Sequence, residues 1–302
     1  MSARRLTSAE VLERLGPIEA PCTLCEVRCG AMRPDGERGA CGLADEVYVY
    51  NRLLHFGEEG PLVPSYAIFL NACSMACSFC SEAHHLLPPF NLPATPPELL
   101  AMKVALDLMG SAASARNINF VGGEPSIALP FLARFVAALD ALVARRPPLL
   151  LNTNGYLSPE ALALATHLCE IFVVDLKFGQ DRCAQAIANT QDYTAVLRRN
   201  LRALAGSTSG FDSEVPVLPV NLWVRHLLMP GHLECCTAPS LQWLAAELPE
   251  AEVNVMTAFH PFGLPDNAPW RALTPAEREQ GRALLDASGI ERAWLDGRRH
   301  GP

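Results

Sequence analysis

Three cysteines on one short segment are the residues of this chain with the clearest chemical meaning. Cys73, Cys77 and Cys80 have a C-x3-C-x2-C spacing in NACSMACSFC, directly after an apolar run. Zinc sites and ordinary iron–sulfur sites use four protein ligands. Three thiolates therefore leave one iron of a 4Fe-4S cluster free to chelate an amino acid, unless a remote residue supplies the fourth ligand. A structural zinc site or an electron-transfer cluster is the alternative.

Four more cysteines lie near the N-terminus, at 22, 25, 29 and 41, in a glycine-rich segment with little apolar periodicity. A segment that cannot build a core needs a metal to fold. We expect a second metal on Cys22, Cys25, Cys29 and Cys41, with structural zinc as the first choice. A second iron–sulfur cluster and uncoordinated thiols are the alternatives. We interpret the other cysteines as core thiols, namely Cys169, Cys183, Cys235 and Cys236.

Glycine or polar residues follow most of the apolar runs. Glycines at 122 and 123 let a backbone approach a ligand without a Cβ in the way. Asp175 is costly to bury alone, and Lys177, two residues on, points to the same side of a strand. A local ion pair is the alternative to ligand binding. Only two of the 24 basic residues are lysines, Lys103 and Lys177, which makes Lys177 a signal in itself.

The elements that position these residues follow from the alternation of short apolar runs and helical patterns. Buried strands spaced by single helices predict parallel βα units, and six units predict an α/β fold, a partial (β/α)6 TIM-type barrel. Barrel enzymes place their active sites at the C-terminal ends of the strands. We expect strands at 66–72, 117–123, 149–155, 171–177, 221–229 and 253–259, and helices at 97–111, 129–146, 158–169, 182–205, 238–248 and 274–288.

The chain divides by composition into three parts. Residues 1–65 are expected to form a helix, begun by a capping box at Thr7 to Glu10, and a small cysteine-rich metal-binding module. Residues 66–290 form the barrel, and 291–302 a solvated C-terminal tail. This division predicts a full-sized core in the middle part, because 50% of the 302 residues are hydrophobic.

Charge and hydropathy exclude several classes of partner. A net charge of −8 argues against nucleic acid and anionic membranes, because phosphate contacts require a basic face. No apolar run approaches the roughly 18 residues that a membrane span needs, and no secretory or transit pattern is present. The 11 cysteines are therefore expected to be reduced, and the protein cytoplasmic.

The cysteine loop resembles the C-x3-C-x-Φ-C signature of the radical S-adenosylmethionine (SAM) superfamily, with Phe79 as the aromatic Φ and an expected cofactor contact. The resemblance implies a 4Fe-4S cluster whose free iron binds the amino and carboxylate groups of SAM. Reductive cleavage of SAM then gives a 5′-deoxyadenosyl radical. NINFVGGEP resembles the GGE motif that meets the methionine amino group, which implies that Gly122, Gly123 and Glu124 bind the cofactor.

Two later segments resemble glycyl-radical-enzyme activases such as pyruvate formate-lyase activating enzyme. LNTNGY (151–156) and VVDLKF (173–178) imply cofactor contacts for Asn152, Thr153 and Asp175, and a SAM-carboxylate contact for Lys177. The activases carry an aspartate where this chain has Asn152. The family chemistry also implies a flavodoxin- or ferredoxin-type electron donor.

A third segment, MTAFHPFG (256–263), resembles a late strand end of the same activases. It makes His260 a catalytic candidate beside Lys177, and a satisfied loop histidine is the alternative.

Taken together, the motifs resemble the uncharacterised subfamily of pyruvate formate-lyase activating enzyme-like radical SAM proteins. The N-terminal CTLC and GERGACG, LHFGEEGPL (54–62) and RHLLMPGHLECC (225–236) extend the match over about residues 20–290. The leading hypothesis is an oxidoreductase that abstracts hydrogen from a protein or peptide, an activase being one form. The alternatives are a small-molecule substrate and a non-catalytic iron–sulfur redox protein. The cofactor-binding set favours an enzyme, because a redox protein needs only the cluster ligands.

Overall fold

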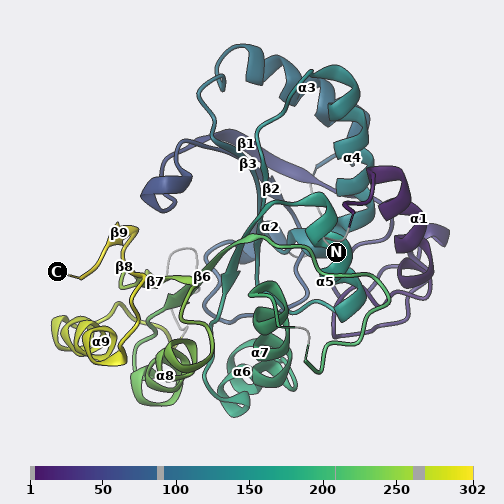
Figure 1. The fold of residues 1–302 in the computed structure, drawn as a ribbon. Coiled ribbons are helices and arrows are strands. Elements are labelled where there is room, and N and C mark those ends of the chain that lie inside the picture. The colour runs from purple at the N-terminus through teal and green to yellow at the C-terminus, as the bar shows by residue number, and fades with distance from the viewer. Residues whose placement is uncertain (1–3, 87–91, 208, 261–268, 302) are drawn as a thin grey trace.

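The computed structural model describes residues 4–86, 92–207, 209–260 and 269–301. Within them, nine strands form one sheet whose spatial order follows the chain from β1 to β9. Strands β2 to β8 run parallel, and β1 and β9 pair antiparallel at the two edges. Most of the helices lie on the outer side of the curved sheet (Figure 1). This confirms the predicted α/β partial barrel.

The strands lie close to the predicted runs, and three more lie outside them. Their bounds are β1 Val49–His55, β2 Ser65–Leu70, β3 Asn117–Gly122, β4 Leu149–Thr153, β5 Ile171–Asp175, β6 Asn221–Leu227, β7 Glu252–Met256, β8 Ala293–Leu295 and β9 Arg298–Arg299. Strands β2 to β5 are almost fully buried, as parallel strands covered on both faces are. The additional strands β1, β8 and β9 are short or partly exposed, so their apolar signal is weak.

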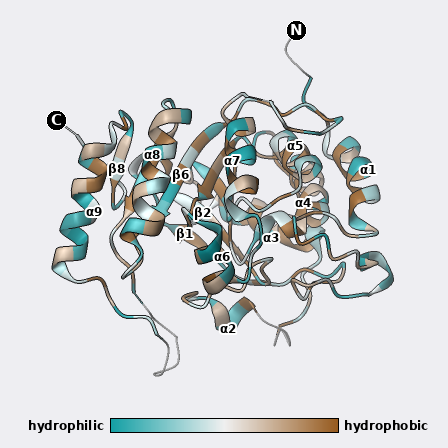
Figure 2. Ribbon diagram, turned by 90° about the horizontal axis from the view of Figure 1, so that it is seen from below, coloured by the Kyte–Doolittle hydropathy of each residue, from teal (hydrophilic) through white to brown (hydrophobic). Residues whose placement is uncertain are grey.

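Most of the helices connect successive strands, and one helix precedes the first strand. They are α1 Ser8–Glu19, α2 Ala83–Leu86, α3 Pro97–Met109, α4 Leu129–Leu142, α5 Pro159–Leu168, α6 Asp181–Ala188, α7 Tyr193–Leu204, α8 Ala238–Glu247 and α9 Pro275–Ser288. The capping box predicted at Thr7 and Glu10 begins α1. In Figure 2, α1, α4 and α5 lie together at one end of the molecule, and α8 and α9 at the other.

The predicted helix at 182–205 is two helices, α6 and α7. Asn189 and Asp192 between them have φ angles of 50° and 48°, which a continuing right-handed helix cannot contain. Asparagine and aspartate tolerate this left-handed region better than most residues. The chain therefore forms two separate helices, α6 and α7, with the break between Ala188 and Tyr193.

Both ends of the chain contribute to the sheet. Strand β1 lies within residues 1–65 but pairs with β2. The first part of the expected C-terminal tail, 291–302, joins the sheet, because β8 pairs with β7 and the Asp296 carboxylate accepts hydrogen bonds from Thr257 N and Oγ1 at 2.7 and 2.8 Å. A strand of three residues gives too little alternation to be recognised from sequence.

One helical segment corrects the expectation about apolar runs. Residues 125–142 form an 18-residue stretch of mean hydropathy 1.5, long and apolar enough to cross a membrane by length and composition. In the structure 67% of it is buried, and α4 packs against α1, α3 and α5. The neighbouring helices therefore cover its apolar surface, as they do for a core helix.

A charged layer fills the barrel below the strand ends. The loop between β1 and β2 directs Glu58 and Glu59 to the interior, where both pair with Arg225. Asn254 Nδ2 donates to Glu59 at 2.7 Å, and Asn119 Nδ2 donates to Glu58 at 2.9 Å. Burial opposes ionisation of Glu58, but Arg225 and His55 bring its pKa down to about 2. The buried guanidinium is thus compensated by two carboxylates.

Candidate active site

A cavity of about 540 Å³ lies at the C-terminal ends of β3 to β7, where barrel enzymes carry their active sites. It brings together residues that are up to 187 positions apart, since both Cys73 and His260 line it. Most of the site residues predicted from sequence lie in its wall, namely Cys73, Cys77, Phe79, Cys80, Gly122, Gly123, Asn152, Thr153, Asp175, Lys177 and His260. Glu124 and the N-terminal cysteines do not line it.

The cysteine loop is held from behind by the C-terminal end of α6. The backbone N–H of Ala76 donates to Ala188 O at 3.2 Å, and that of Ser78 donates to Ile187 O at 2.9 Å. The Phe79 ring packs edge-on against Trp270, with 5.4 Å between ring centroids. These contacts fix the loop between the three cysteines, so the sulfur atoms are positioned by backbone and by packing.

Two glycines allow the end of β3 to press against the start of this loop. A Cβ on Gly122, whose φ is +109°, would lie 2.5 Å from Leu70 O. A Cβ on Gly123 would lie only 1.7 Å from Ala72 O. The sequence predicted that these glycines let the backbone approach a ligand. The close approach that the structure shows is instead to the chain just before Cys73, and the ligand contact stays a prediction.

The three cysteines are partly buried, and desolvation of their thiols raises the pKa of each. For Cys77 the pKa rises to about 11 although the nearby Lys177 charge lowers it. Thiols in this environment become thiolates when a metal replaces their protons. The donor set, three sulfur atoms around one cavity with a cation beside them, fits a cluster that has three protein ligands and an open iron.

Asp175 and Lys177 form an ion pair at the end of β5. The Tyr193 hydroxyl accepts from Lys177 N at 2.7 Å and donates to Asp175 O at 3.1 Å, which fixes the backbone under the pair. Burial alone would lower the pKa of Lys177, but Asp175 and Cys77 outweigh it and raise that pKa. The local ion pair thus exists, and both side chains also line the cavity.

Glu124 lies behind the cavity wall. Its carboxylate accepts from Thr153 Oγ1 and Asn154 N, each at 2.6 Å, and from Ser126 N at 3.1 Å. Burial raises the pKa of Glu124, and these hydrogen bonds oppose that rise. The observed contacts of the carboxylate are therefore with the β4 end and with its own turn at Ser126, and a direct cofactor contact stays a prediction.

Two cavity residues were not singled out from sequence. Asn154 directs Nδ2 toward Cys73 Sγ at 3.8 Å and toward Ser74 Oγ at 3.2 Å. Arg225 lines the cavity and stands beside Asp175 in the pairing of β6 with β5. Both lie inside segments that carried the resemblance, at the last polar position of LNTN and at the start of RHLLMP.

His260 is exposed at the cavity rim, and its neighbours at 261–263 in the MTAFHPFG segment lie outside the described residues.

The N-terminal cysteines lie on a different part of the barrel wall. Cys25 forms a β-bridge with Leu157, and Cys25 and Cys41 pack with Ala72, the residue before Cys73. A Cβ on Gly39 would lie 3.1 Å from Cys29 Sγ and 3.6 Å from Cys41 Sγ, so these two sulfur atoms flank that glycine. The cysteine-rich segment is therefore folded against the barrel, not apart from it.

This chain is similar to known proteins in sequence and in structure. The family model of the radical SAM superfamily matches residues 67–235. The uncharacterized protein MJ0674 of Methanocaldococcus jannaschii is 31% identical over 247 residues, covering 80% of this chain and 66% of that protein.

Among solved structures, SuiB of Streptococcus suis bound to S-adenosylmethionine superposes with a TM-score of 0.50 at 12% identity, over 74% of this chain and 47% of SuiB. A domain of the pyruvate-formate lyase-activating enzyme of Bacteroides vulgatus matches at 17% identity, over 59% of this chain and 97% of the domain. Its TM-score of 0.39 is too low to assign a subfamily.

The chain thus spans less than two thirds of MJ0674 and less than half of SuiB. The family match, however, covers more than half of this chain and contains the cysteine loop, GGEP and the Asp175–Lys177 pair. The chain belongs to the radical SAM superfamily, whose members use a 4Fe-4S cluster and SAM.

Proposed function

We propose that this chain is an oxidoreductase that cleaves SAM reductively and abstracts a hydrogen atom from a protein or peptide substrate. The observation that carries the proposal is the convergence of Cys73, Cys77 and Cys80 with Lys177 on one cavity at the strand ends. When bound, the cluster and SAM supply the electron and the 5′-deoxyadenosyl radical. Activation of a glycyl radical enzyme is one form of this function.

The residues of the chain have distinct parts in this proposal. The three thiolates hold the cluster, and Asn154 points its amide N–H at the Cys73 sulfur. Lys177 offers an ammonium to the carboxylate of SAM, because a compact cation can approach a carboxylate that already chelates iron. Gly122 and Gly123 let the end of β3 pack on the backbone that leads into the cysteine loop. Phe79 lines the same cavity and is proposed to contact the cofactor, and His260 is the exposed candidate catalytic residue at the rim.

The size of the cavity favours a macromolecular substrate. Ligand pockets usually measure about 300–1,000 Å³, and this one, at about 540 Å³, has to hold SAM beside the cluster. SAM would fill part of this space, and the reacting group would enter from the rim. A protein or peptide can present one residue in this way. We also propose that a flavodoxin- or ferredoxin-type donor delivers the electron.

The environment of the N-terminal cysteines supports a second metal centre there. Arg33 is 1% exposed, and its guanidinium donates to Ala44 O and Ile127 O at 2.9 and 2.7 Å. In the described part of the chain it forms no ion pair with a carboxylate within 4.0 Å. A buried cation needs a compensating charge, and metal-bound thiolates of Cys22 and Cys41 beside it would provide one.

The spacing of these four sulfur atoms bears on the kind of metal. The donor atoms of one tetrahedral ion all lie close together. In the described part of the chain, the four N-terminal sulfur atoms do not all lie within 4.8 Å of one another. We therefore favour a second iron–sulfur cluster over zinc at Cys22, Cys25, Cys29 and Cys41. Iron analysis should find about eight irons per reconstituted chain, falling to about four in a Cys25→Ser variant. Four irons in both proteins would contradict this assignment.

The substrate class is tested by isotope transfer. Reduced, reconstituted protein is incubated with SAM and deuterated peptides, deuterated candidate proteins or deuterated small molecules, and 5′-deoxyadenosine is analysed by mass spectrometry. We expect deuterium from a peptide or protein. Transfer from small molecules alone would contradict the proposed substrate class, and a chain that never cleaves SAM would contradict the enzymatic function.

A further inference from the structure

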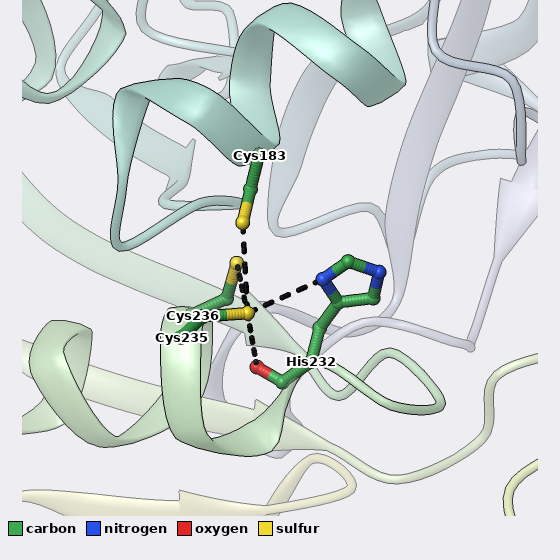
Figure 3. Close-up of side chains that lie close together, drawn as sticks. All are labelled: Cys183, His232, Cys235 and Cys236. Atoms are coloured by element: carbon green, nitrogen blue, oxygen red, sulfur yellow. Dashed lines mark hydrogen bonds between the residues drawn. The ribbon is translucent and has the colours of Figure 1, made fainter.

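Four potential metal ligands converge outside the candidate active site. Cys183, His232, Cys235 and Cys236 bring one donor atom each to within 4.8 Å of the others (Figure 3). Cys183 Sγ lies 3.5 Å from Cys235 Sγ, and Cys235 Sγ lies 3.3 Å from His232 Nδ1 and 3.9 Å from Cys236 Sγ. None of the four lines the candidate active-site cavity.

The local structure explains how three of the donors share one face. His232 directly precedes a π-helical turn, Leu233–Thr237, that leads into α8. Residues three and four positions apart lie on the same side of a helical turn. Cys235 and Cys236 follow His232 by three and four positions, so the three side chains lie on one side of the turn. The fourth donor, Cys183, points down from α6 (Figure 3). Single π-turns are frequent at functional sites because they re-aim side chains.

Three of the donor–donor distances, 3.3, 3.5 and 3.9 Å, are close to those that a single tetrahedral ion imposes, and all the donors lie within 4.8 Å of one another. Zinc–sulfur bonds of about 2.3 Å and zinc–nitrogen bonds of about 2.0–2.1 Å hold the donors roughly 3.5–3.8 Å apart. We propose that Cys183, His232, Cys235 and Cys236 bind one Zn²⁺ through three thiolates and His232 Nδ1. Binding replaces the three thiol protons with the metal.

Two alternatives to a zinc site, a disulfide and a group of inert thiols, agree less well with the observed positions of these four side chains. A disulfide has a bond of about 2.05 Å, well short of the 3.5 Å between Cys183 Sγ and Cys235 Sγ. Inert core thiols need an apolar surrounding, yet an imidazole nitrogen lies against Cys235, which is itself only partly buried. Three sulfur atoms and one imidazole nitrogen form a typical structural zinc set.

The neighbouring loop is shaped to accept this turn. A Cβ on Gly179 would lie 2.6 Å from Cys236 O and 2.9 Å from Cys235 O. The ring of Trp270, which packs on Phe79 of the cysteine loop, lies 6.0 Å from that of His232. The proposed zinc site thus contacts the loop that follows Lys177 and, through Trp270, the cysteine loop.

The position of Cys183 gives the site a function. Cys183 is near the start of α6, and the last residues of α6 accept the hydrogen bonds of Ala76 N and Ser78 N. A metal that fixes α6 to the turn before α8 therefore positions the loop that carries Cys73, Cys77 and Cys80. The four ligands are positioning residues in this respect.

Zinc content of the purified full-length protein tests the site. We expect Cys183→Ala and His232→Ala to lower zinc by about one ion per chain, and His232→Cys, which keeps four donors, to restore it. Cys169→Ala is the matched control, because Cys169 is a fully buried thiol outside the group. Co²⁺ added to metal-depleted wild-type protein should give a thiolate charge-transfer band that His232→Ala weakens. Because His232 is only partly buried, this variant is expected to fold.

Two results would overturn the inference. One is equal zinc in the wild type, Cys183→Ala and His232→Ala, with all three folded by circular dichroism. The other is a Cys183–Cys235 disulfide, detected by mass spectrometry in anaerobically purified protein. The positioning role is measured separately, by hydrogen exchange at Ala76 and Ser78, which should be faster in His232→Ala. Unchanged exchange in a zinc-free variant would remove that role.

Discussion

The side-chain amide of Asn154 lies 3.8 Å from the sulfur of Cys73, while its oxygen accepts a hydrogen bond from Tyr156 N at 2.9 Å. The side chain is therefore oriented with its N–H group toward the proposed cluster. Hydrogen bonds to ligand sulfur atoms raise the reduction potential of iron–sulfur clusters, because they stabilise the more negative reduced state.

Asn154→Asp should lower that potential. Aspartate keeps the oxygen that accepts from Tyr156 N, but it replaces the donor near Cys73 with a carboxylate. A hydrogen bond of about 0.5–1.5 kcal/mol corresponds to about 20–65 mV for one electron. Redox titration followed by electron paramagnetic resonance measures the shift. An unchanged potential would show that the amide does not act on the cluster.

Replacing Cys73, Cys77 and Cys80 together by alanine should abolish both the cluster that binds SAM and the cleavage of SAM. The reason is that these three thiols are the sulfur donors in the cavity wall. Iron content, the reduced-cluster spectrum and 5′-deoxyadenosine formation are the measurements. Cys169→Ala, which removes a buried thiol elsewhere, should leave all three unchanged. SAM cleavage by the triple variant would refute the proposed site.

Lys177→Met should weaken SAM binding by about 1.5–3 kcal/mol, the value of a hydrogen bond to a charged group, without changing the cluster spectrum. Lys177→Arg should restore binding only in part, because a guanidinium is planar and bulkier. Lys103→Met, at an exposed position of α3, is the control. Titration of the reconstituted protein with SAM gives the affinities. Lower thermal stability with normal SAM affinity would instead assign Lys177 only to the ion pair with Asp175.

Glu124→Gln should destabilise the fold more than it weakens SAM binding. Three donors point at this carboxylate, and an amide NH2 cannot accept from them. We expect a loss of about 1–3 kcal/mol in the free energy of unfolding. Glu98→Gln, exposed on α3, is the control. Normal stability with lost SAM affinity would place Glu124 in the cofactor site, as its GGE motif suggests.

Acid should destabilise the protein through His226. The ring is fully buried between Leu176 O and Thr237 Oγ1, and burial lowers its pKa to about 4. Between about pH 6.5 and 4 the unfolded chain binds the proton more strongly, so stability falls as the pH falls. Protonation of His226 is expected to lower the free energy of unfolding by about 3 kcal/mol between pH 6.5 and pH 4.

Unfolding midpoints between pH 7 and 4 measure this dependence. His226→Asn keeps a donor for Leu176 O and should show a flatter profile than the wild type, even if its midpoint at pH 7 is lower. His84→Asn, at an exposed histidine, should leave the profile unchanged. Parallel profiles for wild type and His226→Asn would assign the acid sensitivity to other groups.

The parallel strands and most helices could be predicted because each buried strand is a continuous apolar run with a clear helix after it. Strand β1 escaped prediction because its central residues are exposed at the sheet edge, so its apolar run is interrupted. The predicted helix at 182–205 is broken into α6 and α7 by Asn189 and Asp192, which adopt the left-handed backbone conformation. That conformation has no strong sequence signal.

The cavity was predictable because short motifs at successive strand ends are brought together by any barrel of this type. The group around Cys183 was not, because its donors come from two segments. The sequence shows Cys235 and Cys236 without ligand spacing, and they become ligands in our proposal only when a helical turn adds His232. Cys183, 52 residues before Cys235, joins them only in the folded chain.

The contact between Gly123 and Ala72 bears on the order of events during maturation. Ala72 has a φ of 71°, a conformation that alanine rarely adopts, and its carbonyl fits against Gly123 only when β3 is paired with β2. The first cluster ligand, Cys73, therefore acquires its direction after this part of the sheet has formed. Iron and sulfide are therefore expected to be inserted into a barrel that has already folded. A substitution of Gly123 by a larger residue is expected to lower the amount of cluster that is inserted, and the loss of enzymatic turnover would follow from that.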